Sequence, residues 1–231
     1  MIGEPSLFML QWSWIGLGAA VVLLLIACST SLFRGDLTKS RLYDPAWLAW
    51  IGAAQYMLHN FEEYGLDMYG RTFSFPQQMT QAGMGNIGEF PYLACNILLI
   101  WIVGPLVAVL AKKYPAMAPS MAIIALINGL SHIAQLFNWG YSAGLLTSFV
   151  IFLPVGIWTI YVCYVREKMG WSNFLKTFAV GFLYSVILMA GILSANAGLI
   201  TPTVQGIIMI FDGILALLLW SLIGKKGTIS K

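Results

Sequence analysis

The chain has 231 residues, of which 59% are hydrophobic and only 9% are charged, whereas soluble domains carry about 25% charged residues. This composition excludes a soluble globular protein and an intrinsically disordered one. The formal net charge of +3 does not indicate a nucleic-acid partner, because the basic residues lie in short segments between long apolar stretches.

Seven long apolar segments follow one another along the chain, and about 20 mostly apolar residues suffice for a helix to cross the hydrocarbon of a bilayer. We therefore predict an all-α integral membrane protein, a bundle of seven transmembrane helices that forms a single domain over residues 1–231. The segments cover residues 8–33, 45–68, 88–111, 116–138, 141–165, 174–197 and 202–224.

Basic residues predict the orientation of this bundle, since cytoplasmic loops carry an excess of Lys and Arg. If seven spans alternate, the side that holds the loop at residues 70–88 receives only Arg71. The other side receives the remaining basic residues, which lie in segments 34–41, 112–113, 166–176 and 225–231. We therefore expect the N-terminus outside and the C-terminus in the cytoplasm, as in a bacterial inner-membrane protein.

Ionisable residues gather in the outward-facing halves of the second and fourth segments. His59, Glu62 and Glu63 are spaced i, i+3 and i+4, so that one helix surface carries an imidazole and two carboxylates. Asn128 and His132 have the i, i+4 relationship on the fourth segment. An ionisable group at a helix centre costs about 2.5–3.5 kcal/mol, so each of these residues needs a reason. If the two helices face each other, both histidines and the carboxylates can converge on one site.

Residues 59–63 read His-Asn-Phe-Glu-Glu, a sequence that resembles the signature of the HXXEE-domain membrane proteins. That family also carries a further histidine and a YXPG element. His132 and residues 141–144, Tyr-Ser-Ala-Gly, resemble these features here, with Ala143 in place of the proline. The resemblance covers residues 45–150, and it implies a site and an enzymatic activity whose chemistry is not established.

Four further carboxylates lie at helix ends or inside a span. Glu89 opens the third segment, where it either caps the helix through the dipole or joins the site. Asp212 lies in the middle of the last segment, where it is either functional or a protonated acid that donates to a backbone carbonyl. Asp44 and Asp67 lie at helix ends, and we expect them to be solvated or interfacial.

Imidazole and carboxylate groups from facing helices are typical ligands of a divalent metal such as Zn, Fe or Mn. The candidate metal ligands are His59, Glu63, His132 and Glu89. The candidate catalytic residues, for general acid and base chemistry, are Glu62, Glu63, Asp212 and Tyr141.

We expect a membrane-embedded enzyme that acts by acid–base chemistry, with or without a metal, on a hydrophobic lipid or isoprenoid-like substrate. Such a substrate would enter laterally from the membrane lipids, because the chain has no soluble domain to bind a polar one. The alternative is a cation or proton transporter or sensor that uses the same His/Glu cluster. A hydrogen-bond network that only holds the helices together also stays open, and so does the oligomeric state.

Overall fold

The computed structural model describes residues 5–85 and 87–229, and within these ranges the chain forms helices and loops without a β-strand. The prediction of an all-helical protein is confirmed. Six helical segments of the described chain are long and apolar enough to cross a membrane, namely Leu7–Ser29, Glu89–Ala111, Pro115–Asn138, Leu145–Arg166, Trp171–Asn196 and Pro202–Lys225. These segments indicate an integral membrane protein, because a helix satisfies its backbone polar groups without water.

Two of the six segments contain wide π-helical turns, and in each segment one of these turns is followed by a proline. α4 (Glu89–Asn96) continues through η3 (Ile97–Val103) into α5 (Gly104–Ala111), whose second residue is Pro105. A second continuous helix consists of α7 (Leu145–Thr147), η5 (Ser148–Phe152), α8 (Leu153–Ile160) and η6 (Tyr161–Arg166), with Pro154 directly after the first residue of α8. Because a proline ring clashes with the carbonyl four residues earlier, a wider turn accommodates it.

The other membrane-length helices are α1 (Leu7–Ser29), α6 (Ser120–Trp139, preceded by the 3₁₀ turn η4, Pro115–Met117), α9 (Trp171–Asn196) and α10 (Pro202–Ile229). Large apolar side chains are exposed along them. Leu7, Leu175 and Phe211, for example, have exposed fractions of 70%, 64% and 68%. Soluble proteins rarely expose continuous apolar surfaces of this kind, so lipid tails are the solvent that suits these helices.

A further helix packs among these segments but does not meet the same length and hydropathy criteria. α2 (Pro45–Asn60) continues as the π-helical turn η2 (Phe61–Gly65). Most residues of α2 are buried, and it packs against α1, α5, α6 and α8. Because its neighbours cover it, α2 needs no apolar surface toward lipid and tolerates polar residues near its end. The predicted seventh transmembrane helix is therefore not confirmed by length and hydropathy.

Asp44 and Asp67 were expected to be solvated or interfacial, and exposure to solvent is wrong for both, since only 1% and 5% of their surfaces are exposed. The carboxylate of Asp44 caps α2 and accepts a further hydrogen bond from the backbone N–H of Gly35 at 2.8 Å. Asp67 pairs with Arg71, whose Nη2 lies 2.7 Å from Oδ2. It also accepts a hydrogen bond from the backbone N–H of Tyr69. Each carboxylate therefore organises a loop beside one end of the α2–η2 helix.

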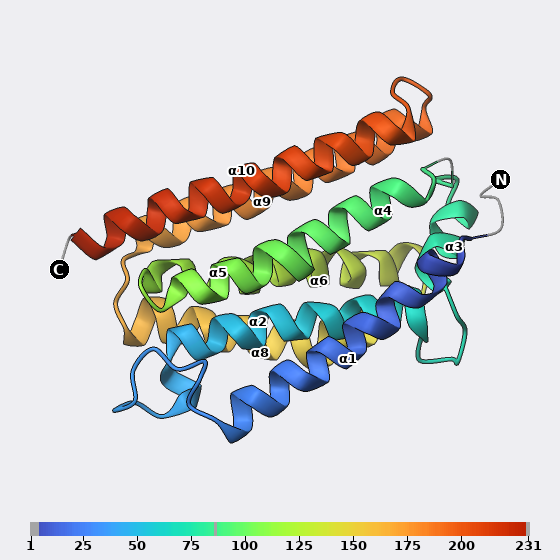
Figure 1. The fold of residues 1–231 in the computed structure, drawn as a ribbon. Helices are drawn as coiled ribbons and strands as arrows, with labels where there is room; N and C mark the ends of the chain where they lie inside the picture. The colour runs from blue at the N-terminus through green and yellow to red at the C-terminus, as the bar shows by residue number, and fades with distance from the viewer. Residues whose placement is uncertain (1–4, 86, 230–231) are drawn as a thin grey trace.

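The helices run roughly side by side, and α1 begins at one end of the bundle whereas α10 ends at the other (Figure 1). The short helix α3 (Ser74–Gln81) lies at the end where α1 begins (Figure 1), and we call this the α3 end. The loops at residues 30–44, 112–114 and 167–170 gather at the opposite end (Figure 1).

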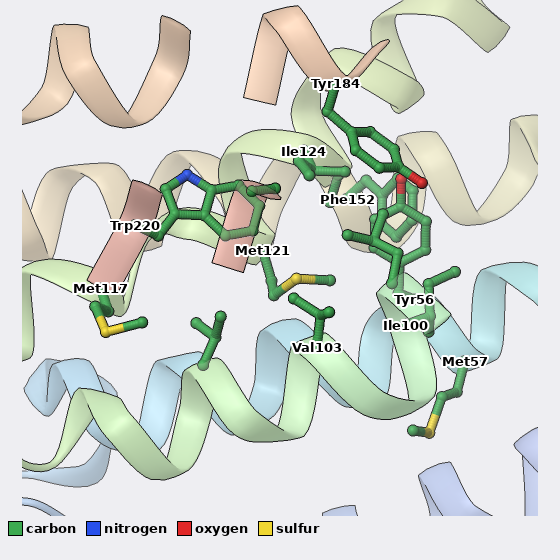
Figure 2. Close-up of a cluster of buried hydrophobic side chains, with 14 of the residues drawn as sticks. Tyr56, Met57, Ile100, Val103, Met117, Met121, Ile124, Phe152, Tyr184 and Trp220 are labelled. Atoms are coloured by element: carbon green, nitrogen blue, oxygen red, sulfur yellow. The ribbon is translucent and has the colours of Figure 1, made fainter. Parts of the chain in front are cut away.

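The middle of the bundle holds a packed apolar core. Phe152 and Trp220 are fully buried there, and Figure 2 shows them with Met121 and neighbouring apolar side chains. Tyr56 from α2 and Tyr184 from α9 belong to the same cluster. This core fills the bundle between the polar side chains near α3 and the opposite end.

Candidate metal centre

Both histidines of the chain and one carboxylate meet near the α3 end of the bundle. Oε1 of Glu63 lies 3.5 Å from Nε2 of His59 and 3.3 Å from Nε2 of His132. Each of the three side chains offers one ligand atom, and these atoms lie within 4.8 Å of one another. The predicted convergence of His59, Glu63 and His132 is confirmed.

The separations between these atoms suit a shared metal ion. Ligands about 2.0–2.1 Å from a tetrahedral zinc are about 3.4 Å apart, whereas a direct charge-assisted N–H···O bond is about 2.7–2.9 Å long. The two N···O distances of 3.5 and 3.3 Å match the metal geometry better. All three side chains are buried, with exposed fractions of 0% for His59, 5% for Glu63 and 1% for His132. A carboxylate in such a place needs a compensating positive charge or proton.

A chain of hydrogen bonds fixes which nitrogen of His59 carries the hydrogen. Nδ1 of His59 lies 2.8 Å from Oγ1 of Thr147, and this hydroxyl donates to Oε2 of Glu62 at 2.6 Å. Because the hydroxyl hydrogen is used toward Glu62, Nδ1 must be the donor to Thr147. Nε2 then carries a lone pair, and it accepts a hydrogen bond from Nδ2 of Asn128 at 3.1 Å. This is the tautomer in which Nε2 can bind a metal.

The other two ligand residues also have polar partners behind them. Nδ1 of His132 lies 3.1 Å from Oγ of Ser142, so its Nε2 is the nitrogen that faces Glu63. Oε2 of Glu63 accepts a hydrogen bond from Nδ2 of Asn60 at 3.3 Å, and the same amide nitrogen donates to Oδ1 of Asn96 at 2.9 Å. Such outer partners orient ligating side chains in known metal sites.

Glu62 lies beside the site, but four hydrogen bonds occupy its carboxylate. Oε1 accepts from the hydroxyl of Tyr141 at 3.0 Å and from the backbone N–H of Leu146 at 3.1 Å. Oε2 accepts from the backbone N–H of Thr147 at 2.7 Å, in addition to the Thr147 hydroxyl. The carboxylate therefore caps the helix that begins at Leu145, where free N–H groups and the helix dipole favour an anion.

The loop at residues 141–144 packs its backbone against both imidazole rings. Gly144 has a φ of +97°, and a Cβ at this position would lie 2.6 Å from Cε1 of His59 and 2.8 Å from Cε1 of His132. Only glycine permits this approach and this conformation at low cost. Ala143, which stands in place of the proline of the YXPG element, donates its backbone N–H to Oε1 of Gln78 at 2.8 Å. A proline could not make this bond.

The helix α3 and the loops beside it cover the site. The ring of Phe75 lies 5.8 Å from the ring of His132, and Tyr69 packs edge-on against Tyr141 at 4.9 Å, both measured between centroids. Burial and the nearby Glu62 carboxylate raise the pKa of Tyr141, so its phenol stays protonated and donates. Burial opposes ionisation of Asp67, but hydrogen bonds from Arg71 outweigh it and hold the pKa of Asp67 below its ordinary value.

A cavity of about 420 Å³ adjoins the ligand group, and both Glu63 and His132 form part of its wall. The remaining wall is largely apolar and comes from α2, α3, α4, η3, α6, α9 and α10. Its lining includes the exposed residues Ser131 and Ala134 of α6 and Met189 of α9. Parts of the cavity lining on α6 and α9 therefore also reach the outer surface of the bundle.

Two of the predicted site residues lie apart from the ligand group. Glu89, at the start of α4, accepts a hydrogen bond from the backbone N–H of Ser6 and so connects α4 to the start of α1. Asp212 of α10 is 6% exposed, and its Oδ2 has no hydrogen-bond partner in the described part of the chain. Neither residue belongs to the His/Glu group, and neither lines the cavity.

Three contributors to the site did not emerge from the sequence: Ser142, Gly144 and Thr147. Ser and Thr are common in transmembrane helices, so a hydroxyl there carries no signal of its own. The available signal was proximity in sequence, because these residues lie within or just after the YXPG-like element.

Residues 50–159 match the family model described as "Protein of unknown function with HXXEE motif". The match confirms the resemblance carried by residues 59–63. It includes all three ligand residues and the loop at residues 141–144. No curated protein and no solved structure was found to be similar to the chain.

Proposed function

We propose that this HXXEE-domain protein is a membrane-embedded enzyme in which His59, Glu63 and His132 bind one divalent metal ion. The observation that supports this most is the convergence of two Nε2 atoms and one carboxylate oxygen in a buried place. The hydrogen bond from Nδ1 of His59 to Thr147 leaves a lone pair on Nε2, and the ion would replace the Asn128 amide as the partner of this lone pair. A cation is the simplest partner for such a set of acceptors.

The ligand set suits a catalytic ion better than a purely structural one. Two histidines and one carboxylate are typical ligands of catalytic Zn and of non-haem Fe(II), which keep at least one position for water or substrate. Because Glu63 and His132 line the cavity, we infer that this remaining position faces the cavity.

The residues of the chain have distinct roles in this proposal. The bound ion supplies Lewis acidity at the end of the cavity. Thr147 and Glu62 orient His59, and Tyr141 fixes Glu62, so we assign these three residues to positioning. Oε2 of Glu63, the oxygen that accepts from Asn60 at 3.3 Å, is available to take a proton from a group held in the cavity.

An apolar substrate fits this cavity best. Its wall is largely apolar and includes exposed residues of α6 and α9, so we infer that the cavity opens at the side of the bundle between these helices. In a membrane this opening would face hydrocarbon, so a lipid or isoprenoid-like molecule could enter without passing through water. Exclusion of water would also strengthen the electrostatic effect of the ion on the substrate.

We further propose that the α2–η2 helix crosses the membrane with the six other segments, with the N-terminus outside. The start of α1 and the end of α10 lie at opposite ends of the bundle (Figure 1), as an odd number of crossings requires. The basic residues favour a cytoplasmic C-terminus. The protein would then lie in a bacterial inner membrane with its site in the outer half.

In a variant without native cysteines, a cysteine at Gln81 should react with an impermeant maleimide on intact cells, and one at Ser172 should not. The reverse pattern would overturn this orientation.

Transport of a cation or proton through the same cluster is less well supported. A transported ion would need a polar route from the site to the opposite end of the bundle. The apolar core, including the fully buried Met117, Met121 and Trp220, occupies that region (Figure 2).

Metal content of the purified protein tests the proposal. We expect about one equivalent of Zn, Fe or Mn in the wild type and a loss of most of it in His59→Ala and His132→Ala. Glu89→Gln is the matched control, because Glu89 lies outside the ligand group, and it should keep its metal. If a histidine variant does not fold, removal of the metal from the wild type with a chelator should still lower the melting temperature. A wild type that takes up no divalent metal would overturn the proposal.

A further inference from the structure

The buried amide side chain of Gln205 lines the same cavity, although Gln205 lies far from the metal ligands in the sequence. Gln205 lies near the start of α10, is fully buried, and lines the cavity. Neither Oε1 nor Nε2 of its side chain has a hydrogen-bond partner in the described part of the chain. Because an unpaired buried amide is costly, its presence at a cavity wall points to a partner that occupies the cavity.

The packing around Gln205 holds the amide in this place. A Cβ on Gly191 of α9 would lie 3.3 Å from Cγ of Gln205, so the side chain rests directly on the backbone of the neighbouring helix. Tyr92 of α4 also lines the cavity, is 6% exposed, and has a hydroxyl without a partner among the described residues. The cavity wall therefore offers an amide and a phenol that can both donate and accept hydrogen bonds.

The charges around the cavity restrict what such a partner can be. The lining residues include no Lys or Arg, and Glu63 is the acidic residue among them. A phosphate or carboxylate group on the ligand would be buried without a cationic partner at Gln205, which is strongly unfavourable. A neutral polar group that hydrogen-bonds to an amide avoids this cost.

We propose that the cavity binds a neutral, largely apolar molecule whose hydroxyl, carbonyl or amide group hydrogen-bonds to the side chain of Gln205. Tyr92 supplies a further hydroxyl to the wall of the same cavity. The volume of about 420 Å³ lies within the range of about 300–1,000 Å³ that is typical of small-molecule sites. That this molecule is the substrate rests on the proposed metal enzyme, whereas its binding at Gln205 does not.

Three probes of equal chain length test the recognition: dodecanol, dodecane and dodecanoate. Each is added to the purified, metal-loaded protein in detergent, and the bound fraction is measured by native mass spectrometry. We expect dodecanol to bind more tightly than dodecane or dodecanoate. Equal binding of dodecanol and dodecane, or tighter binding of dodecanoate, would overturn the proposal.

Two glutamine variants test whether the tighter binding of dodecanol depends on Gln205. Gln205→Met should weaken the binding of dodecanol about fivefold to tenfold, which corresponds to one lost hydrogen bond, and leave the binding of dodecane unchanged. Gln55→Met is the matched control, because Gln55 is 2% exposed and also has an unpartnered amide among the described residues, yet does not line the cavity. It should bind dodecanol as the wild type does. An equal loss in both variants, or none in Gln205→Met, would contradict the assignment.

Metal content separates this inference from the proposed function. Both glutamine variants should keep the metal of the wild type, because neither residue touches the ligand group. If the protein takes up no metal but still binds dodecanol preferentially through Gln205, the binding site is supported and the proposed metal enzyme is overturned. If the protein binds metal but does not discriminate between the probes, the metal centre is supported and the proposed role of Gln205 is overturned.

Discussion

Thr147 connects His59 to Glu62: its hydroxyl oxygen lies 2.8 Å from Nδ1 of the imidazole and 2.6 Å from Oε2 of the carboxylate. The hydroxyl accepts from the ring and donates to the carboxylate, so Nε2 of His59 is left unprotonated toward Glu63. Thr147→Val keeps the shape of the side chain and removes this link. We expect its metal affinity to fall about 10-fold to 100-fold, measured by competition with a chelator. Thr147→Ser should keep the wild-type affinity, and an unchanged affinity in Thr147→Val would contradict the orienting role.

The adjacent carboxylates Glu62 and Glu63 should respond in opposite ways to the same substitution. Glu62→Gln places an amide NH₂ among four donors, so the metal-free protein should lose about 1–3 kcal/mol of stability. Glu63→Gln removes a buried charge, so the metal-free form of this variant should keep the wild-type stability or gain some. When the variant is supplied with metal, it should bind less metal than the wild type. Thermal unfolding in detergent and metal analysis measure both effects. A Glu63→Gln variant that keeps full metal content would remove Glu63 from the ligand set.

The backbone at Gly144 should tolerate no side chain. A Cβ there would lie within 3 Å of both imidazoles, so Gly144→Ala should displace the ligands and abolish most metal binding. Gly140 provides the control, because it also has a positive φ, of +78°, but a Cβ added there would meet no described atom within 4 Å. With a ψ of −152°, Gly140→Ala should cost only the backbone strain of about 1–3 kcal/mol and keep the metal. Equal metal loss in both variants would show that strain, and not contact with the imidazoles, is the cause.

The pair of Asp67 and Arg71 should make stability depend on acidic pH. Hydrogen bonds from Arg71 hold the pKa of Asp67 below its ordinary value. The carboxylate therefore contributes its full stabilisation above the unfolded pKa of about 4, and this contribution is lost as the pH falls through the lower folded value. Asp67→Asn should be less stable than the wild type at neutral pH, with the difference shrinking below about pH 4. A difference that stays constant between neutral and acidic pH would contradict the ion pair's role.

The sequence pointed to His59, Glu63 and His132, because both histidines of the chain lie in apolar segments, each in reach of polar residues one helical turn away. It also placed Glu89 among the ligands, and Glu89 lies outside this group. His59 and Glu63 share a helix surface at i, i+4, and the fourth segment supplies His132. The partners Thr147 and Ser142 escaped prediction because their positions depend on how the loop at residues 141–144 folds back onto the two rings.

The carboxylates outside the ligand group show the limits of the sequence pattern. Glu62 and Glu63 are adjacent in sequence, and only the packing against the helix that begins at Leu145 separates a capping carboxylate from a ligand. Glu89 could have capped a helix or joined the site, and its contact with Ser6 depends on where α1 begins. Tertiary packing also explains why α2 tolerates polar residues. Its neighbours in the bundle, and not its own length, determine how much apolar surface it needs.

X-ray absorption at the edge of the bound metal tests the central claim most directly. We predict a first shell of nitrogen and oxygen ligands at about 2.0–2.2 Å, with the outer scattering of two imidazole rings. In His132→Ala any metal that remains should show the scattering of one ring. A metal bound by sulfur, or a spectrum without imidazole scattering in the wild type, would contradict the assignment of His59, Glu63 and His132 as its ligands.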